Sequence, residues 1–268
     1  MPCSSSPPLS PANSLPSVTR YKPCAVVPVY NHSAGIQIVC PGILDHGLPC
    51  VLVDDGSDTT CAAVLDSLAG DSEHVHLIRF SENRGKGAAV CAGLEWAFQQ
   101  GFSHALQIDA DGQHDLSDIP EFIAVSKRAP QAVVTGDREA RGISKARHYG
   151  RKLTDWLVWV ETLSVQIRDS MCGYRIYPLA QTIALLQKTR VGQRMDFDTD
   201  ILVRLVWRGI TVEQVRTRVV YRPEIPSHFR LLRDNVRVTR MHILLLTGML
   251  VRLPLLIFRK PEVSERNT

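Results

Sequence analysis

The clearest candidates for chemistry are two aspartates, Asp109 and Asp111, which stand two positions apart directly after an apolar run at 105–108. Two carboxylates at the end of a buried strand can hold one Mg²⁺ or Mn²⁺, because these hard cations prefer oxygen ligands and share their shell with substrate phosphates. Taken alone, the triplet is more typical of a polar strand exit that caps the next helix. Its placement at the end of an apolar run favours the metal site.

A second acidic pair, Asp54 and Asp55, follows another apolar run at 50–53. If both runs are parallel strands, their carboxyl ends meet at one edge of a sheet, where α/β proteins bind ligands. Alone, this pair is better explained by an Asx-turn in which Gly56 takes a left-handed conformation.

Lys86 lies between the two acidic pairs, in a glycine-rich segment at 81–89 that precedes a predicted helix. Helix N-terminal amides and a lysine together can bind a phosphate. The segment lacks the G-x-x-x-x-G-K-[ST] pattern of a P-loop. A solvated, glycine-rich helix start is the alternative.

The elements that must position these residues alternate along the first half of the chain. Short apolar runs predict strands at 24–29, 50–53, 74–78, 105–108 and 132–135, and amphipathic stretches predict helices at 33–46, 59–69, 86–100 and 117–128. Strands that alternate with helices through short connections predict an α/β fold with a mostly parallel sheet.

The pattern changes after residue 137. A stretch at 137–152 holds six Lys and Arg residues and leads into an apolar stripe of helical spacing that contains Trp156 and Leu163. The segment 173–178 predicts a short strand or turn. A helix over 198–207 and a strand over 211–221 follow.

Composition limits the class of protein. The chain has 268 residues, of which 44% are hydrophobic and 22% charged, so it can bury a sizeable core. Its seven cysteines form no C-x-x-C pair, which argues against a disulfide framework and a zinc site and suits a reducing cytoplasm. The Ser- and Pro-rich residues 1–22 predict a flexible tail.

The C-terminal region is basic, with twelve Lys and Arg against three Asp and Glu between residues 204 and 260. Four arginines, at 230, 233, 237 and 240, predict the basic face of an amphipathic helix beside an apolar face. Such a helix suits an anionic membrane surface, although a solvated arginine face on a core-packed helix remains the alternative. The longest apolar run, at 243–251, is too short to span a bilayer, so no transmembrane helix is predicted.

Four motifs, in this order and spacing, resemble those of family-2 glycosyltransferases with the GT-A fold. The matching segments are Val27-Pro-Val-Tyr-Asn31, Val53-Asp-Asp-Gly-Ser57, Asn83-Arg-Gly-Lys-Gly-Ala-Ala89 and Asp109-Ala-Asp-Gly-Gln-His114. The resemblance covers about residues 24–225. Segments 136–138 and 173–177 are similar to those of polyprenyl- and dolichyl-phosphate sugar transferases, and residues 227–235 resemble the tail of glycosyltransferases from aryl-polyene-type pathways. His32 stands where the family often has Glu.

The resemblance implies a role for each matching residue. A nucleotide diphosphate sugar would be held by Pro28, Tyr30, Asn31, Asp54, Lys86 and Asp109. Mg²⁺ or Mn²⁺ would be held by Asp109, Asp111 and Gln113, and would neutralise the leaving diphosphate. The phosphate of a lipid acceptor would be held by Arg138, Arg147 and Arg175.

The acceptor decides whether the reaction needs a base. A lipid phosphate is already ionised, whereas a hydroxyl must lose its proton to a carboxylate. Asp198 and Asp200 are the candidates for that base, and both are equally typical of an acidic helix N-terminus.

We therefore predict a metal-dependent, inverting glycosyltransferase in the cytoplasm, peripheral on the inner face of the membrane. Its GT-A domain spans 23–226 and its basic amphipathic segment spans 227–268. A hydroxyl acceptor on a lipid or pigment is the alternative. A nucleotidyltransferase is more remote, as is a nucleic-acid binder, because the basic segment lacks a recognisable reading motif; no nucleic-acid partner is expected.

Overall fold

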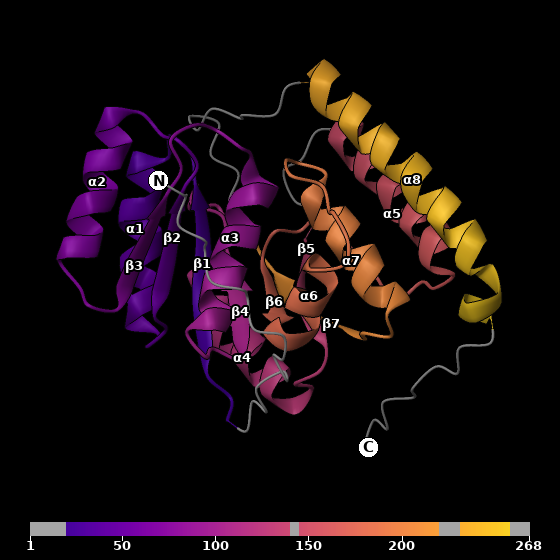
Figure 1. The fold of residues 1–268 in the computed structure, drawn as a ribbon, viewed down its shortest axis with the longest axis horizontal. Helices are drawn as coiled ribbons and strands as arrows, with labels where there is room; N and C mark the ends of the chain where they lie inside the picture. The colour runs from indigo at the N-terminus through magenta and orange to yellow at the C-terminus, as the bar shows by residue number, and fades with distance from the viewer. Residues whose placement is uncertain (1–19, 140–144, 220–230, 258–268) are drawn as a thin grey trace, which may run out of the picture.

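The computed structural model describes residues 20–139, 145–219 and 231–257. At its centre is one seven-stranded sheet with the order β3-β2-β1-β4-β6-β5-β7 (Figure 1). Six strands run in the same direction, and β6 is antiparallel to both of its neighbours. The strands are β1 (Pro23–Val29), β2 (Cys50–Asp54), β3 (Val75–Arg79), β4 (His104–Gln107), β5 (Val133–Arg138), β6 (Arg175–Pro178) and β7 (Val212–Thr217).

Helices cover both faces of the sheet and separate two hydrophobic cores. One core is closed by α1 (Ser33–Asp45), α2 (Thr59–Gly70) and α4 (Ile119–Arg128), which the short 3₁₀ helix η1 (Leu116–Asp118) precedes. The other core is closed by α3 (Lys86–Gln99), α6 (Leu179–Leu186) and α7 (Phe197–Trp207), and against these lie α5 (Lys145–Thr162) and α8 (Leu231–Ile257).

The central strands form here because their side chains are apolar on both faces. All residues of β2 and β4 are buried, as expected for parallel strands covered by helices on both sides. A local signal sets the start of α2: the Asp58 carboxylate caps this helix by accepting from the Cys61 amide at 2.8 Å. The predicted α/β fold with a mostly parallel sheet is confirmed, and its first nine elements lie within a few residues of their predicted positions.

Because β6 is antiparallel to its neighbours, β6 begins at the edge of the sheet where the parallel strands end. Segment 173–175 therefore lies beside the residues that follow β4, because Gln107 pairs with Arg175. The prediction of a short strand or turn at 173–178 allowed this arrangement but did not specify its direction.

The C-terminal helix α8 is longer than the sequence analysis expected. It runs for 27 residues beside α5, with Pro254 inside it (Figure 1). The part Arg233–Ile257 is long and apolar enough to cross a membrane, judged by length and composition. The prediction that this region is too short for that is wrong, because Arg252 and Pro254 do not end the helix.

The proposed boundaries of the tail, the GT-A domain and the C-terminal segment stay predictions. Most of the tail, residues 1–19, lies outside the described residues.

Candidate active site

A cavity of about 450 Å³ opens at the carboxyl edge of the parallel strands. We call it the sheet-edge cavity. Its walls come from the ends of β1, β2 and β4, the start of α3, the loop before α7 and the first turns of α8. The lining residues are Pro28, Val29, Tyr30, His32, Asp55, Asn83, Gly85, Lys86, Asp109, Ala110, Asp111, Arg194, Met195, Arg233, Asp234 and Arg237.

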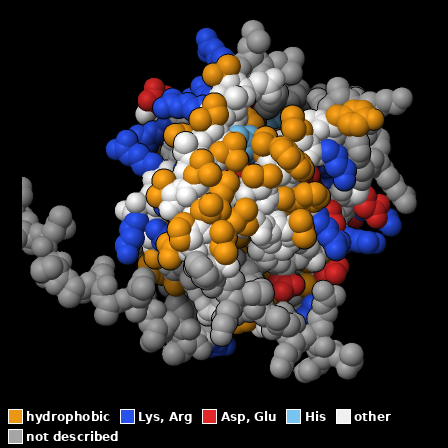
Figure 2. Space-filling view, turned by 90° about the vertical axis from the view of Figure 1, so that its right-hand side faces the viewer, with side chains coloured by type: hydrophobic (Ala, Val, Ile, Leu, Met, Phe, Trp, Pro, Cys, Tyr) orange, Lys and Arg blue, Asp and Glu red, His pale blue; other side chains and the backbone are white. Residues whose placement is uncertain are grey.

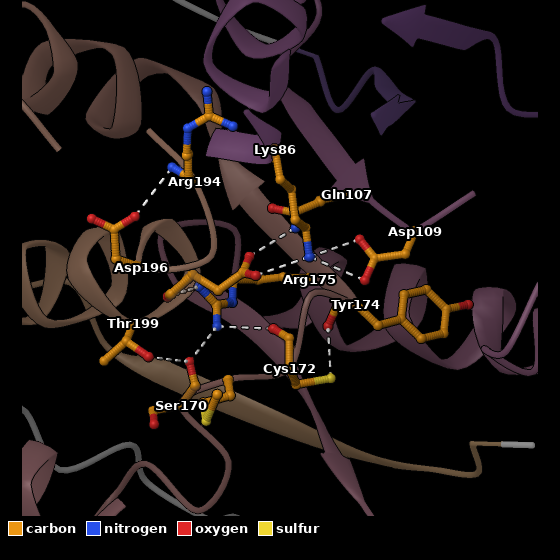
Figure 3. Close-up of polar contacts among 12 residues, drawn as sticks. Lys86, Gln107, Asp109, Ser170, Cys172, Tyr174, Arg175, Arg194, Asp196 and Thr199 are labelled. Atoms are coloured by element: carbon orange, nitrogen blue, oxygen red, sulfur yellow. Dashed lines mark hydrogen bonds and ion pairs between the residues drawn. The ribbon is translucent and has the colours of Figure 1, made fainter. Parts of the chain in front are cut away.

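Lys86 is the cation at the floor of this cavity. Its Nζ lies 2.8 Å from Asp109 Oδ1 and 2.9 Å from Asp198 Oδ2 (Figure 3). Burial alone would lower the pKa of Lys86, but the two carboxylates outweigh burial and raise it. The lysine is therefore charged and balances two acids, so the alternative of a solvated side chain is excluded.

Glycines allow the chain to close tightly around Lys86. Gly85 has a φ of 108°, and a Cβ at this position would lie 2.5 Å from the Gln193 carbonyl oxygen. A Cβ on Gly173 would lie 2.6 Å from Lys86 Nζ and 3.0 Å from an Asp109 carboxylate oxygen. The Gly-Lys-Gly pattern and the glycine before Tyr174 thus make room for the lysine and its acidic partner.

Asp111 lines the same cavity and is partly exposed. Its Oδ1 accepts from the Gln113 amide at 3.0 Å, and burial together with the nearby Asp109 carboxylate raises its pKa to about 6. Gln113 supports Asp111 through its main chain, and its side chain does not belong to the cavity wall among the described residues.

The oxygen ligands present fit one hard divalent cation. The Asp109 carboxylate is bound by Lys86 on one side, and both Asp109 and Asp111 line the cavity. Within the described ranges, no group of three or more His, Cys, Asp or Glu side chains is arranged to hold a metal. Two carboxylates can suffice when phosphate oxygens and water complete the shell.

The structure separates the roles of Asp54 and Asp55. Asp54 accepts from the Ser57 amide at 2.8 Å and pairs with Arg79 at 2.8 Å, while Gly56 has a φ of 71°. This is the Asx-turn that the sequence analysis left as the alternative. Asp55, not Asp54, lines the cavity, so the expected contact of Asp54 with a base or ribose lacks support from its position.

Asp55 ties the cavity wall to the segment before α3. Its carboxylate accepts from the amides of Arg84 and Gly85 at 2.7 and 2.9 Å and from the Asn83 side chain at 3.0 Å. Burial is the main cause that raises its pKa. Pro28 and Tyr30 line the cavity as expected. Asn31 instead joins two loops through a 2.8 Å bond from the Asp58 amide to its side chain.

These features agree with a match to known proteins. Residues 24–189 match the model of the Glycosyl transferase family 2 domain. The chain belongs to this glycosyltransferase family.

The chain is similar to several curated members of the family. It is 29% identical to the polyprenol monophosphomannose synthase of Mycolicibacterium smegmatis, over 71% of this chain and 74% of that protein. It is 25% identical to the undecaprenyl-phosphate mannosyltransferase of Micrococcus luteus, over 74% and 83% of the two chains.

Solved structures show the same fold at low identity. The glucosyl-3-phosphoglycerate synthase of Mycobacterium tuberculosis, in complex with Mn²⁺ and uridine-diphosphate-glucose, superposes with a TM-score of 0.64. It shares 13% identity, over 90% of this chain and 84% of that one. The expected glycosyltransferase fold is confirmed.

The two carboxylates considered as a base lie outside the wall of this glycosyltransferase's cavity. Asp198 is bound by Lys86 and, at 2.8 Å, by the Gln107 side chain. Asp200 accepts from the Gly192 amide at 2.8 Å and from Arg204 at 2.5 Å. Both belong to the first turn of α7, as the alternative interpretation of an acidic helix N-terminus expected.

The three arginines expected at the acceptor differ in position. Arg138 ends β5 and forms a double hydrogen bond with Asp169, at 2.6 and 2.8 Å. Arg147 belongs to α5, and its side chain lies outside the described residues. The Arg175 side chain has no exposed surface, so its position gives no support to the expected contact with the acceptor.

Arg175 supports the site from below. It donates to the main-chain oxygens of Asp198, at 2.7 Å, and Cys172, at 3.0 Å (Figure 3). It therefore links the segment before β6 to the first turn of α7, where Asp198 contacts Lys86.

The sequence analysis assigned no cavity role to several of the lining residues. Asp55 was quoted in a motif without a role, and His32 was noted only as a departure. Arg194 and Met195 precede α7 and match none of the motifs quoted, while Arg233, Asp234 and Arg237 belong to α8. The basic face of α8 gave a signal, but no local pattern indicates that a helix 150 residues downstream of Lys86 closes the same cavity.

Proposed function

We propose that this glycosyltransferase moves a sugar, with inversion, from a nucleotide diphosphate sugar to the phosphate of a polyprenyl lipid. Support comes from two relatives, which are named polyprenol monophosphomannose synthase and undecaprenyl-phosphate mannosyltransferase. One observation carries the proposal. Among the described residues of the cavity wall, every carboxylate either has a structural partner or belongs to the pair Asp109 and Asp111 that would hold the metal. No carboxylate of the described wall is therefore left to act as a base.

Residues of the sheet-edge cavity would bind the sugar donor. Pro28 and Tyr30 would wall the base, and Asp109 and Asp111 would hold Mg²⁺ or Mn²⁺. When bound, that ion would neutralise charge on the departing diphosphate. Lys86 would orient the Asp109 carboxylate and keep a positive charge beneath the diphosphate.

A phosphate acceptor is favoured because no carboxylate of the described cavity wall is placed to act as a base. Asp55 is held by two amides, Asp234 is paired with Arg237 at 2.9 Å, and Asp198 is held by Lys86. A hydroxyl acceptor would need one of them to accept its proton, whereas a phosphate acceptor is ionised near neutral pH. Arg138, which is partly exposed, would hold that phosphate together with Arg147.

The surface formed by α5 and α8 supports a membrane location. On α8, Val236, Ile243, Leu244, Leu250, Val251 and Leu255 are each more than half exposed. On α5, Leu153 and Trp156 are exposed to a similar extent. Figure 2 shows hydrophobic side chains gathered over this side of the molecule, with lysines and arginines at its edges.

Packing favours a helix that lies on the membrane over one that crosses it. Met241, Leu245 and Met249 are buried against the rest of the molecule, and His242 Nδ1 lies 2.7 Å from Glu161 Oε1 of α5. A spanning helix would have to give up these contacts. We propose that the α5–α8 surface rests on the inner face of the membrane.

Product analysis tests the proposed reaction. The full chain is incubated with a panel of nucleotide sugars, Mn²⁺ or Mg²⁺, and either a polyprenyl phosphate or the matching polyprenol. We expect nucleoside diphosphate release and a phosphate-linked sugar only with the polyprenyl phosphate. Transfer to the polyprenol would identify a hydroxyl acceptor, and release of pyrophosphate would identify a nucleotidyltransferase; either result would overturn the proposal.

A further inference from the structure

A second cavity, of about 350 Å³, lies beside the sheet-edge cavity and has a different chemistry. The loop at 190–196, the helix α7 and the helix α8 form its walls. Five arginines and two aspartates line it, and two of the arginines, Arg194 and Arg237, also line the sheet-edge cavity. We call it the arginine cavity.

Part of this positive charge is already neutralised. Arg204 pairs with Asp200 at 2.5 Å, and Arg237 pairs with Asp234 at 2.9 Å. Arg194 donates to the Asn83 side chain at 2.7 Å. These contacts hold three guanidinium groups in place around the cavity.

The remaining two arginines have no such partner. Arg190 and Arg240 are exposed and form no hydrogen bond or ion pair with another described residue. They belong to two different walls of the cavity, one to the loop before α7 and the other to α8. Because arginine presents a planar fork that matches phosphate oxygens, the pair suits a phosphate group bound between the two walls.

The rim of the arginine cavity is apolar on the side of α8. Met241 and Leu244 line it, and Leu244 also belongs to the exposed apolar face of that helix, with 53% of its surface accessible. A ligand seated here would therefore meet cations at one end and a hydrophobic surface continuous with the α5–α8 side at the other. Free phosphate would use only the cations, whereas a lipid would use both.

We propose that the arginine cavity binds the phosphate headgroup of an anionic membrane lipid, apart from the acceptor. Arg190 and Arg240 would contact the phosphate, and the acyl chains would leave over Leu244 onto the apolar face of α8. The site differs from a diffuse attraction between a basic helix and a charged surface, because one of its two free arginines comes from a loop that is distant in sequence. This inference rests on the proposed membrane location but not on the proposed reaction.

Vesicle sedimentation without sugar donor or acceptor tests the site. The full chain is mixed with vesicles of phosphatidylcholine alone or with phosphatidylglycerol added. Arg190→Gln with Arg240→Gln removes the two free cations. We expect this double variant to bind the anionic vesicles about tenfold or more weakly than the wild type, since each arginine near an anionic surface contributes about 1 kcal/mol.

The matched control is Arg128→Gln with Arg208→Gln, which removes the same charge from two exposed positions outside both cavities. We expect it to bind as the wild type does. Equal losses in both double variants would show that only net charge matters, and wild-type binding by Arg190→Gln with Arg240→Gln would show that the cavity is not used. Either result overturns the proposal.

Titration calorimetry with inorganic phosphate alone separates a lipid from a free anion. We expect no saturable binding at millimolar phosphate. Saturable binding that Arg190→Gln with Arg240→Gln abolishes would overturn the lipid assignment in favour of a free phosphate. Loss of vesicle binding in the double variant, with sugar transfer in detergent unchanged, would support this site whatever the acceptor is.

Discussion

The edge of the sheet and the helix α8 both line the sheet-edge cavity, but their side chains are arranged in opposite ways. At the sheet edge, acids and Lys86 turn inward and satisfy one another within a few ångströms. On α8, Arg233, Arg237 and Arg240 line the two cavities, while a row of apolar side chains faces outward. The sheet edge therefore holds the groups that could do chemistry, whereas α8 connects the cavities to an exposed apolar surface.

The largest expected effect is a loss of turnover without a loss of stability when a proposed metal ligand is replaced. Replacement of Asp111 by Asn removes a carboxylate that would hold the divalent ion, so we expect turnover to fall by roughly 100-fold or more. The free energy of unfolding should hardly change, because Asp111 is partly exposed and an Asn oxygen can still accept from the Gln113 amide. Nucleoside diphosphate release and urea unfolding measure the two quantities.

Metal removal complements that variant. Wild-type turnover should be lost in EDTA and return with Mn²⁺ or Mg²⁺. Near-normal turnover in EDTA would contradict the metal assignment and would leave Asp109 and Asp111 as a polar strand exit.

The second prediction concerns the buried charge balance at Lys86. Its replacement by Met leaves the carboxylates of Asp109 and Asp198 facing each other without a cation. We expect the free energy of unfolding to fall by about 3 kcal/mol, since breaking a buried ion pair strands the remaining charge. Urea unfolding near neutral pH measures this loss.

The same variant also reports on the metal. A divalent ion on Asp109 would replace part of the lost positive charge and stabilise the folded state by binding to it. Mn²⁺ should therefore raise the stability of Lys86→Met more than that of the wild type. An equal response of both proteins would mean that the ion does not bind beside Lys86.

The sheet edge was largely predictable from sequence, and α8 was not. Apolar runs that end on Asp54 and Asp109 follow a short-range rule, so strand ends and acidic residues could be located together. The sequence did not predict which aspartate of the pair Asp54 and Asp55 faces the cavity. The two differ by one position, and their orientation depends on Arg79, Ser57 and the amides before α3.

The orientation of α8 depends on long-range packing. Its periodicity predicts an arginine face and an apolar face, but only contacts with α5, α7 and the loop at 190–196 decide where each face points. The expected stripe on α5 illustrates the same limit, because Trp156 and Leu163 lie at the surface while Val158 and Glu161 are buried.

The third prediction tests the outward face of α8. Val251 is 80% exposed, and its replacement by Gln should weaken binding to vesicles by about fivefold, since an apolar side chain loses roughly 1 kcal/mol or more of transfer free energy. Ile38→Gln, on α1 at the far side of the molecule, is the matched control and should bind normally (Figure 1). If both variants bind as the wild type does, the apolar face of α8 does not contact the membrane.

The smallest expected effect concerns how α8 is anchored to α5. Glu161 has no exposed side-chain surface, and one of its carboxylate oxygens has no partner among the described residues. Burial raises its pKa, and the hydrogen bond with His242 only partly opposes this. The folded protein therefore binds a proton here more tightly than the unfolded chain does.

The sign of the pH dependence follows from that difference. A raised carboxyl pKa contributes stability that is fully present below the ordinary Glu value of about 4.3 and is lost as pH rises through the folded value. In Glu161→Gln this loss disappears, because the amide stays neutral and still reaches His242. We expect the stability of the variant relative to the wild type to increase with pH across this window, measured by urea unfolding at a series of pH values. Glu95→Gln, at an exposed position, is the control for the loss of one carboxylate. A difference for Glu161→Gln that does not change with pH would contradict the prediction and would mean that the carboxylate is stabilised as an ion.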